Sequence, residues 1–312
     1  MCNTIKLITH TDLDGVSCAI LAKLAFGNHV EIEYCDYSDM DSKFKDVIEE
    51  LKTKPQRYFV TDLNLSESLI NQIDEVNKDK NLLLFDHHQS SLPFGDKDWI
   101  CAADRDENDN PVCGTSLFYG YLKMFPGGLD YVCDKFVEYV TYWDTWQWEN
   151  KGADGDMSKN LSNLLSIYGR DSFLSKMVDH LSKRVSNFKL DKTDVEVLDI
   201  REAEMRRYIS DKNKQLKCFV VDNYTVGVVF AERFISQLGN ELCRRNPDID
   251  FAAIVQPAYN TVSLRSIKDV DLSEFAKRYG GGGHKLSAGM PYSEDLNIEL
   301  VQSIFGNITL KN

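Results

Sequence analysis

Apolar and polar positions alternate in blocks along the first 90 residues of the chain. Short apolar runs, which are typical of buried strands, are separated by amphipathic stretches with a helical period. The predicted strands are IKLIT (5–9), VEIEYC (30–35), RYFVT (57–61) and NLLLF (81–85), and the predicted helices cover 16–26, 39–51 and a stretch from residue 66. Strands and helices that alternate at this spacing form right-handed crossovers, so we expect an α/β fold with a mostly parallel sheet and helices on both faces.

The middle of the chain is predicted to be helical, and the block pattern then starts again. Helical patterns cover 115–124, 129–142 and 161–183, and a charged stretch at 191–210 predicts a solvated connecting helix. After residue 211, strands are predicted at KCFVVD, YTVGVVF, DFAAIVQ and TVSLRS, with a helix at 233–245. We therefore expect a larger domain over 1–188, a connecting helix over 189–212 and a smaller α/β domain over 213–312.

Length, composition and charge mainly exclude certain classes of protein. With 312 residues, 43% of them apolar, the chain is long enough for two well-formed cores. The net charge of −13 argues against a protein that coats duplex DNA, but it permits a small phosphorylated ligand held by metal ions and a few basic residues. The eight cysteines form no C-x-x-C pair, and neither a signal peptide nor a membrane span is visible, so we expect a cytoplasmic protein with no membrane partner.

Three predicted strands run directly into residue types that bind metals. IKLIT leads to His10, Asp12 and Asp14, RYFVT leads to Asp62, and LLLF leads to Asp86, His87 and His88. The carboxyl ends of parallel strands meet at one edge of a sheet, which is where ligands bind in open α/β folds. The sequence therefore predicts that acids and imidazoles from three separate segments gather in one site.

Each of these motifs also has a simple structural explanation. The acids before Gly15 suit a turn and a helix N-cap, Asp62 suits the cap of the helix predicted from residue 66, and His87 suits a buried histidine paired with backbone groups. Those alternatives stay open for each motif taken alone. Their coincidence at three strand ends favours a shared metal site.

The residue types indicate which ions the site would hold. Carboxylate oxygens together with two imidazoles suit Mn²⁺ or Mg²⁺ better than a thiolate-type zinc site. An acidic cluster without cations would suffer mutual repulsion, which raises the pKa values of its members. A pair of divalent ions polarises a phosphoryl group, activates water and stabilises the leaving oxygen. The predicted reaction is the metal-assisted hydrolysis of a phosphate ester.

The motifs HTDLDG, VTDLN, FDHHQS and YWDTW, in that order, resemble the four motifs of the DHH phosphoesterase superfamily. In the second half, VSLRS followed by RYGGGGHKLSAG resembles the DHHA1 substrate domain that accompanies one branch of that superfamily. The resemblance covers nearly the whole chain. It is closest to the stand-alone oligoribonucleases called nanoRNases, although HTDLDG lacks the proline and small-residue context of many of them.

The resemblance implies a role for each motif residue. One metal would be held by His10, Asp12 and Asp62, and the other by Asp14, Asp62, His87 and Asp144, with Asp62 as the bridge. Asp86 would orient His87, and His88 would face the scissile phosphate. Asp144 comes from the resemblance alone, since the run FVEYVTYW before it is also typical of an aromatic helix in the core.

The glycine-rich run suggests where the substrate binds. Glycines at 280–283 let the backbone come close to a ligand and present N–H groups to an anion. His284 and Arg265 would add charge-assisted contacts to a terminal phosphate. The predicted substrate-binding residues are Arg265, Gly281, Gly282, Gly283 and His284, and the alternative is a flexible turn between a helix and a strand.

Together with these features, the resemblance implies a Mn²⁺-dependent phosphodiesterase or exonuclease with two divalent cations, Mn²⁺ before Mg²⁺. It would release mononucleotides from short single-stranded oligoribonucleotides held between the domains. The alternatives are a cyclic or linear dinucleotide phosphodiesterase, a 3′-phosphoadenosine 5′-phosphate phosphatase, and a binding module without catalysis. All six metal-type residues are present, which argues against the last of these. A homodimer is compatible with the sequence.

Overall fold

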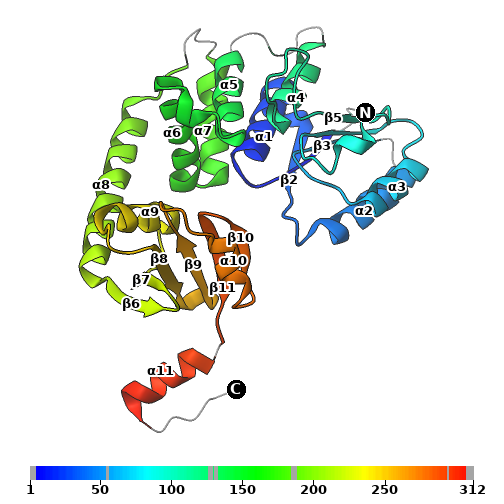
Figure 1. Cartoon of the computed structure of the whole chain (residues 1–312). Helices are drawn as coiled ribbons and strands as arrows, with labels where there is room; N and C mark the ends of the chain where they lie inside the picture. Colours follow the sequence, from blue (N-terminus) through cyan, green and yellow to red (C-terminus); the bar gives the residue numbers. More distant parts are fainter. Residues whose placement is uncertain are drawn as a thin grey trace. The chain divides into compact units, whose positions relative to one another are not determined.

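The computed structural model describes residues 5–53, 56–125, 129, 133–183, 188–293 and 295–306. The chain divides into two compact units, Met1–Leu198 and Asp199–Asn312. The division falls within the long helix α8 (Lys192–Gln215), which carries the chain from the first unit into the second (Figure 1). Among the described residues, no helix has the length and apolar character needed to span a membrane.

The first unit is built on a sheet with the strand order β2-β1-β3-β4-β5, in which all neighbouring strands are parallel. The strands are β1 (Ile5–Thr9), β2 (Val30–Tyr34), β3 (Arg57–Thr61), β4 (Leu82–Asp86) and β5 (Ile100–Ala102). The parallel sheet and the four strands predicted for this region are confirmed. The sequence pattern does not predict β5, because a strand of three residues is too short to show a period.

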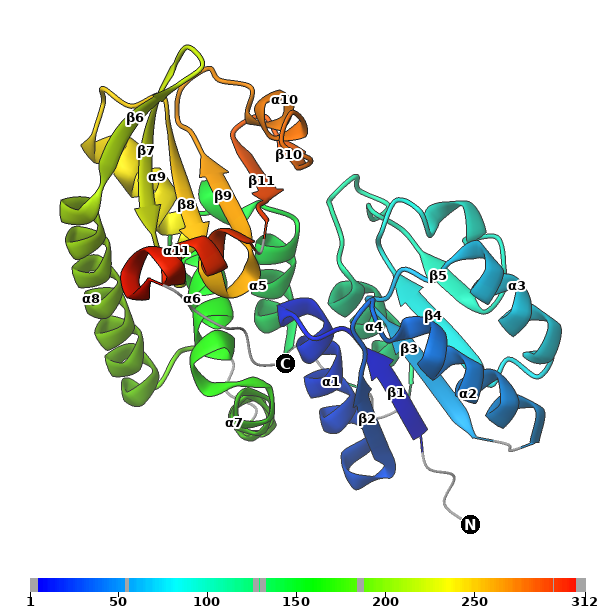
Figure 2. The same ribbon diagram turned by 90° about the horizontal axis from the view of Figure 1, so that it is seen from below.

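Helices cover both faces of this sheet, as the alternating pattern predicts. They are α1 (Leu13–Phe26), α2 (Met40–Thr53), α3 (Glu67–Val76), α4 (Gly114–Lys123), α5 (Asp134–Asp144), α6 (Ala153–Tyr168) and α7 (Arg170–Ser182). Figure 2 shows α2 and α3 on the opposite side of the sheet from α1. Leu7 of β1 belongs to the core formed with α1 and α4–α7, whereas the next residue, Ile8, belongs to the core formed with α2 and α3. The predicted helix over 161–183 is two helices, because Gly169, with φ +72°, ends α6.

The second unit contains a mixed sheet with the strand order β10-β11-β9-β8-β7-β6. Its strands are β6 (Lys217–Val221), β7 (Tyr224–Phe230), β8 (Phe251–Gln256), β9 (Thr261–Arg265), β10 (Gly282–His284) and β11 (Ser287–Pro291). Four of them are predicted from the sequence, whereas the glycine-rich run conceals β10 and β11.

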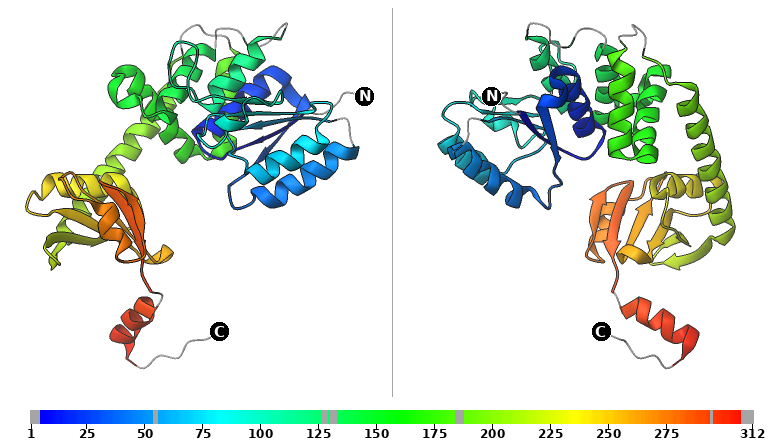
Figure 3. Two further views of the ribbon diagram at one scale, coloured as in Figure 1. Left: turned by 45° about the vertical axis from the view of Figure 1, so that its right-hand side comes forward. Right: turned by 180° about the vertical axis from the view of Figure 1, so that it is seen from behind.

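Helices lie on both faces of the second sheet as well. One face packs on α8 and on α9 (Ile235–Arg245), and the other packs on α10 (Leu272–Lys277). Figure 3 shows α8 entering this unit beside its strands, with α11 (Asp295–Phe305) at the end of the described chain.

Candidate metal centre and substrate-binding residues

The order of the strands in the first unit determines where its ligand site lies. From β1 the chain turns first to β2 on one side and later to β3 on the other, so β1 and β3 flank a topological switch point. Ligands bind outside the carboxyl ends of the strands at such a point. β1 ends directly before His10 and β3 ends directly before Asp62, and these two strands are neighbours.

Asp12 is both the N-cap of α1 and a neighbour of His10. Its Oδ1 atom accepts a hydrogen bond from the N–H of Gly15 (3.1 Å), and its Oδ2 atom lies 3.1 Å from Nδ1 of His10. The contact with Asp12 raises the pKa of His10. Residue 15 must be glycine, because a Cβ atom there would lie 2.2 Å from the carbonyl oxygen of His10. The capping explanation for Asp12 is thus correct, and it leaves one carboxylate oxygen facing the site.

Asp14 is buried in the first turn of α1 and is held by the start of another helix. Its two carboxylate oxygens accept the backbone N–H groups of Gly114 (2.7 Å) and Thr115 (2.8 Å) at the beginning of α4. The N-terminus of a helix stabilises a carboxylate in this position. A Cβ atom at residue 114 would lie 2.9 Å from both Asp14 Oδ2 and Asp62 Cβ, so the site also depends on Gly114. Sequence reasoning misses Gly114, because it is 100 residues away from Asp14.

Asp62 lies at the centre of the cluster. It adopts a left-handed backbone conformation (φ +54°), and its N–H donates to the carbonyl oxygen of Phe85, which ties the end of β3 to β4. Its Oδ2 lies 3.7 Å from His10 Nδ1, and its Oδ1 lies 3.6 Å from His87 Nε2. Burial, followed by the negative charges of its neighbours, raises the pKa of Asp62 well above its usual range.

Asp144, the last residue of α5, is the remaining carboxylate of the cluster. Its Oδ2 lies 3.4 Å from His87 Nε2, and the same nitrogen lies 3.9 Å from Asp14 Oδ2. Burial raises the pKa of Asp144 to about 8, with additional contributions from the charges of Asp14 and Asp12. The structure therefore brings together all six side chains that the sequence assigns to metals.

These side chains form three groups whose ligand atoms all lie within 4.8 Å of one another. The groups are His10–Asp12–Asp62, Asp14–His87–Asp144 and Asp62–His87–His88. The first two match the two sets that the resemblance implies, with Asp62 next to both. Within the described residues, the buried atoms Asp62 Oδ2 and Asp144 Oδ2 have no hydrogen-bond partner. Buried carboxylate oxygens without partners are costly, and divalent cations would satisfy them, so the residues fit a metal centre.

Asp86 does not have the partner expected for it. Its side chain contacts Nδ1 of His88 (2.7 Å) and accepts a hydrogen bond from the hydroxyl of Ser91, and neither contact involves His87. The expectation that Asp86 orients His87 is therefore wrong. The hydrogen bond with Asp86 raises the pKa of His88. Burial is the largest influence on Asp86 and raises its pKa, but the contacts with His88 and Ser91 and the charge of His87 together lower the pKa below its usual value.

Arg265 and His284 lie in one row of the second sheet. Arg265 pairs with Ser287, and Ser287 pairs with His284, so the three side chains point to the same face of β9, β11 and β10. The guanidinium of Arg265 donates to Ser236 Oγ (3.0 Å) in the first turn of α9. Its aliphatic part passes over Gly239, where a Cβ atom would lie 2.5 Å from Arg265 Cγ.

The three predicted glycines of the substrate site differ in their surroundings. A Cβ atom at Gly281 would lie 2.1 Å from the carbonyl oxygen of Gly289, and one at Gly283 would lie 2.6 Å from Cα of Ala288. Both glycines are thus required for the close packing of β10 on β11. A Cβ atom at Gly282 would meet nothing within 4 Å. Packing explains the first two glycines, whereas Gly282 has open space above it.

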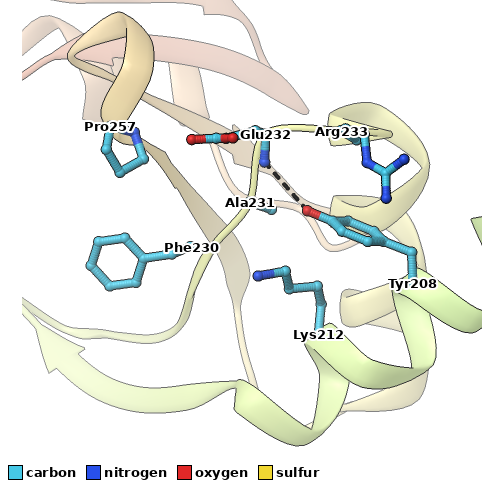
Figure 4. Close-up of a pocket in the computed structure, with 7 residues that line it drawn as sticks. All are labelled: Tyr208, Lys212, Phe230, Ala231, Glu232, Arg233 and Pro257. Carbon is cyan, nitrogen blue, oxygen red and sulfur yellow. Dashed lines mark hydrogen bonds between the residues drawn. The ribbon is translucent and has the colours of Figure 1, made fainter.

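A pocket of about 270 Å³ lies elsewhere in the second unit (Figure 4). Its lining residues come from α8, the end of β7 and the segment before α9, together with one proline: Tyr208, Lys212, Phe230, Ala231, Glu232, Arg233 and Pro257. The N–H of Glu232 donates to the hydroxyl of Tyr208. This pocket includes none of the predicted substrate residues.

Comparisons with known proteins agree with the motifs. No protein-family model matches the chain. The oligoribonuclease NrnB of Bacillus subtilis is 35% identical over 298 residues, which cover 93% of this chain and 73% of that protein. A 3′,5′-cyclic-nucleotide phosphodiesterase of Helicobacter pylori is 25% identical over 351 aligned positions, covering 96% of this chain and 98% of that protein. A solved structure, the DHH domain of a member of the s1p family of ribosomal proteins, has a TM-score of 0.58 at 12% identity, covers 97% of this chain and 85% of that chain, and supports the fold alone.

Proposed function

Because the chain belongs to the DHH family of phosphoesterases, we propose that it is a Mn²⁺-dependent phosphodiesterase that hydrolyses short single-stranded oligoribonucleotides to mononucleotides. The relative that supports this substrate class is the oligoribonuclease NrnB of B. subtilis. Mn²⁺ is preferred to Mg²⁺ because two histidines accompany the carboxylates, and Mg²⁺ favours ligand sets made of oxygen.

One observation carries the proposal. Asp62 lies next to both ligand groups, within 3.7 Å of His10 and 3.6 Å of His87, while one of its buried oxygens has no hydrogen-bond partner among the described residues. Asp62 would therefore be able to hold a cation together with the residues of either group. The four acids of the cluster carry a formal charge of −4, which two divalent cations would balance.

The side chains of the first unit would divide the work as follows. When bound, two divalent cations supply the charge that polarises the phosphoryl group and activates water. Asp86 holds Nδ1 of His88 and fixes its imidazole. We propose that the other imidazole nitrogen donates a hydrogen bond to the scissile phosphate and carries a proton to the leaving oxygen.

The second unit would supply phosphate recognition. Its sequence from Asp199 to Asn312 contains equal numbers of acidic and basic residues, so the whole net charge of −13 belongs to the first unit. The guanidinium of Arg265 donates a hydrogen bond to Ser236, and the aliphatic part of its side chain packs over Gly239. A guanidinium that is fixed in this way loses less conformational entropy when it binds a phosphate. The open space above Gly282 would allow the substrate to approach the backbone.

A substrate panel tests the proposal. Diribonucleotides to decaribonucleotides, cyclic dinucleotides and 3′-phosphoadenosine 5′-phosphate would be incubated with the protein and Mn²⁺, and the products identified. We expect mononucleotides from the short linear substrates, and no activity in Asp62→Ala. Asp109→Ala is a matched control, because Asp109 also has a left-handed backbone (φ +65°) but lies on an exposed loop. Full activity in Asp62→Ala would refute the two-cation assignment.

A second candidate function follows from the other relative. The H. pylori protein is named a 3′,5′-cyclic-nucleotide phosphodiesterase, and it matches 96% of this chain. The same cluster would serve a cyclic or linear dinucleotide or 3′-phosphoadenosine 5′-phosphate, since hydrolysis of each needs cations at a phosphate. The panel separates these substrates, because a cyclic dinucleotide specialist would leave linear trimers and longer substrates intact.

A further inference from the structure

An exposed tryptophan follows the metal centre at the end of α5. Trp146 is two residues beyond Asp144, so the Cα atoms of the two residues lie within about 7 Å of each other. All four tryptophans of the chain lie in its described part, and Trp146 alone is exposed, at 70% of its surface. Burial of this large apolar ring would stabilise the fold, so packing does not explain its place in solvent.

The backbone of Trp146 adopts a left-handed conformation, with φ +57°. Helix α5 ends at Asp144, Thr145 is its C-cap, and the N–H of Trp146 donates to the carbonyl oxygen of Trp143 (3.3 Å). Glycine is the usual residue directly after a C-cap of this kind, because a Cβ atom strains the left-handed conformation. The turn itself would therefore favour glycine, and the reason for a tryptophan at this position has to lie in its ring.

Neighbouring residues hold the indole in place, although most of it lies in solvent. The ring centroid of Trp146 lies 6.1 Å from that of Trp148. The ring of Trp148 in turn lies 5.4 Å from that of Trp143, which packs against the core of the first unit. The hydroxyl of Thr145 donates to the carbonyl oxygen of Thr141 (2.6 Å), which fixes the turn before the indole. A ring that is fixed before its ligand arrives loses little entropy on binding.

The place and the chemistry of this ring match one part of a nucleotide. A nucleobase lies one sugar away from its phosphate, so a phosphate held at the metal centre brings a base close to the end of α5. Stacking on an aromatic ring suits any base, because every base has a π-face. An indole also carries no charge, so it does not pair with the carboxylates of the cluster as a basic side chain would.

We propose that Trp146 is the platform on which one base of the substrate stacks, beside the phosphate held at the metal centre. This inference rests on the proposed function, which supplies the nucleotide. It gives the first unit a contact with the base, in addition to its contacts with the phosphate.

Two ligands that differ only by a base test the inference. Adenosine 5′-monophosphate and ribose 5-phosphate would be titrated into the Mn²⁺-loaded protein, and their dissociation constants measured by calorimetry. We expect the wild type to bind the nucleotide about 5- to 100-fold more tightly than the sugar phosphate, the range of one base stacked on an aromatic side chain. Trp146→Gly should bind both ligands equally. A wild type without this preference, or a preference that persists in Trp146→Gly, would overturn the inference.

Two further variants show whether the effect belongs to the ring of Trp146. Trp146→Phe keeps an aromatic face and should prefer the nucleotide more than Trp146→Gly does. Phe125→Ala is the matched control, because Phe125 is also an exposed aromatic residue of the first unit (43%). It follows the far end of α4, whose ten residues place it about 15 Å from Gly114 at the site. Phe125→Ala should bind both ligands as the wild type does, and loss of the preference in this variant would overturn the inference.

Thermal unfolding separates a substrate platform from a structural residue. Glycine relieves the strain of the left-handed backbone, so Trp146→Gly should keep or raise the melting temperature of the protein. A lower melting temperature would make the ring part of the fold and overturn the inference.

Failure of the proposed function gives a different result. A wild-type protein that leaves every oligonucleotide of the panel intact would refute the proposed function, even if it prefers the nucleotide to the sugar phosphate. Hydrolysis of diribonucleotides by a wild type whose preference does not depend on Trp146 would refute the inference alone.

Discussion

Replacing Asp144 by asparagine should stabilise the metal-free protein while it removes activity. The pKa of this carboxyl is raised from 3.8 to about 8, mainly by burial. About four pKa units at 1.36 kcal/mol each set an upper limit of about 5 kcal/mol on the cost of holding this acid in the folded protein at pH 8. An asparagine amide at the same buried position would itself lack partners, which costs about 1–3 kcal/mol. We therefore expect Asp144→Asn to raise the free energy of unfolding by about 2–4 kcal/mol in a chelator at pH 8.

The dependence on pH has a definite sign. An acid with a raised pKa binds its proton more tightly in the folded state than in the unfolded chain. The stability of the metal-free wild type should therefore fall as the pH rises from about 4 toward 8, and the fall should be smaller in Asp144→Asn. Divalent cations should reverse this trend, because they bind the deprotonated carboxylates.

Urea unfolding, followed by tryptophan fluorescence, measures these effects at pH 5.5, 7 and 8, in a chelator and in Mn²⁺. Asp86→Asn is the matched control, since Asp86 is also a buried acid of the first unit but its pKa is lowered, with His88 and Ser91 as hydrogen-bond partners. That variant should be less stable than the wild type at pH 8. If Asp144→Asn is likewise destabilised in the chelator at pH 8, the acidic cluster is not under electrostatic strain and the reasoning is wrong.

Three further predictions concern the substrate and the imidazole. Arg265→Ala should raise KM for a diribonucleotide about 10- to 100-fold, as expected for a lost charge-assisted hydrogen bond, and metal analysis should find the bound Mn²⁺ unchanged. The control Phe230→Ala, in the separate pocket, should leave KM unaltered. Gly282→Ala should raise KM without changing the melting temperature, whereas Gly281→Ala should lower the melting temperature, because only the latter Cβ atom would collide with β11. His88→Ala should lower kcat about 10²- to 10⁴-fold and keep the metal; loss of metal would instead make His88 a ligand, as in its group with Asp62 and His87.

The sequence predicts the first unit well because its signals are local. Each strand carries a run of apolar residues, and parallel topology brings the carboxyl ends of such strands together without any knowledge of distances. His10 and Asp62 are found in this way, since they follow neighbouring strands. Asp144 is different, because it is the last residue of helix α5 and follows no strand, so the strand pattern does not indicate it. Only the resemblance to a known family supplies it in advance.

Residues that support the cluster are not predicted from the sequence, for a different reason. Gly114 makes room for Asp14 and Asp62, and the hydroxyl of Tyr37 meets His88. Both depend on contacts between segments that are far apart in the chain. A glycine before a helix or a tyrosine in a connecting segment has many common explanations, so neither carries a signal of its own in the sequence.

Local backbone geometry explains why Asp86 contacts His88 and does not orient His87, as the resemblance implies. Along an extended backbone successive side chains point to opposite sides, so residues i and i+2 share a side. Asp86 ends β4, and His88 is two residues further on, whereas His87 is its direct neighbour. The carboxylate therefore bonds to His88, and His87 turns toward Asp14, Asp62 and Asp144. In the sequence Asp86-His87-His88, alternation explains why the carboxylate pairs with His88, although the two imidazoles stay in contact, with ring centroids 4.7 Å apart.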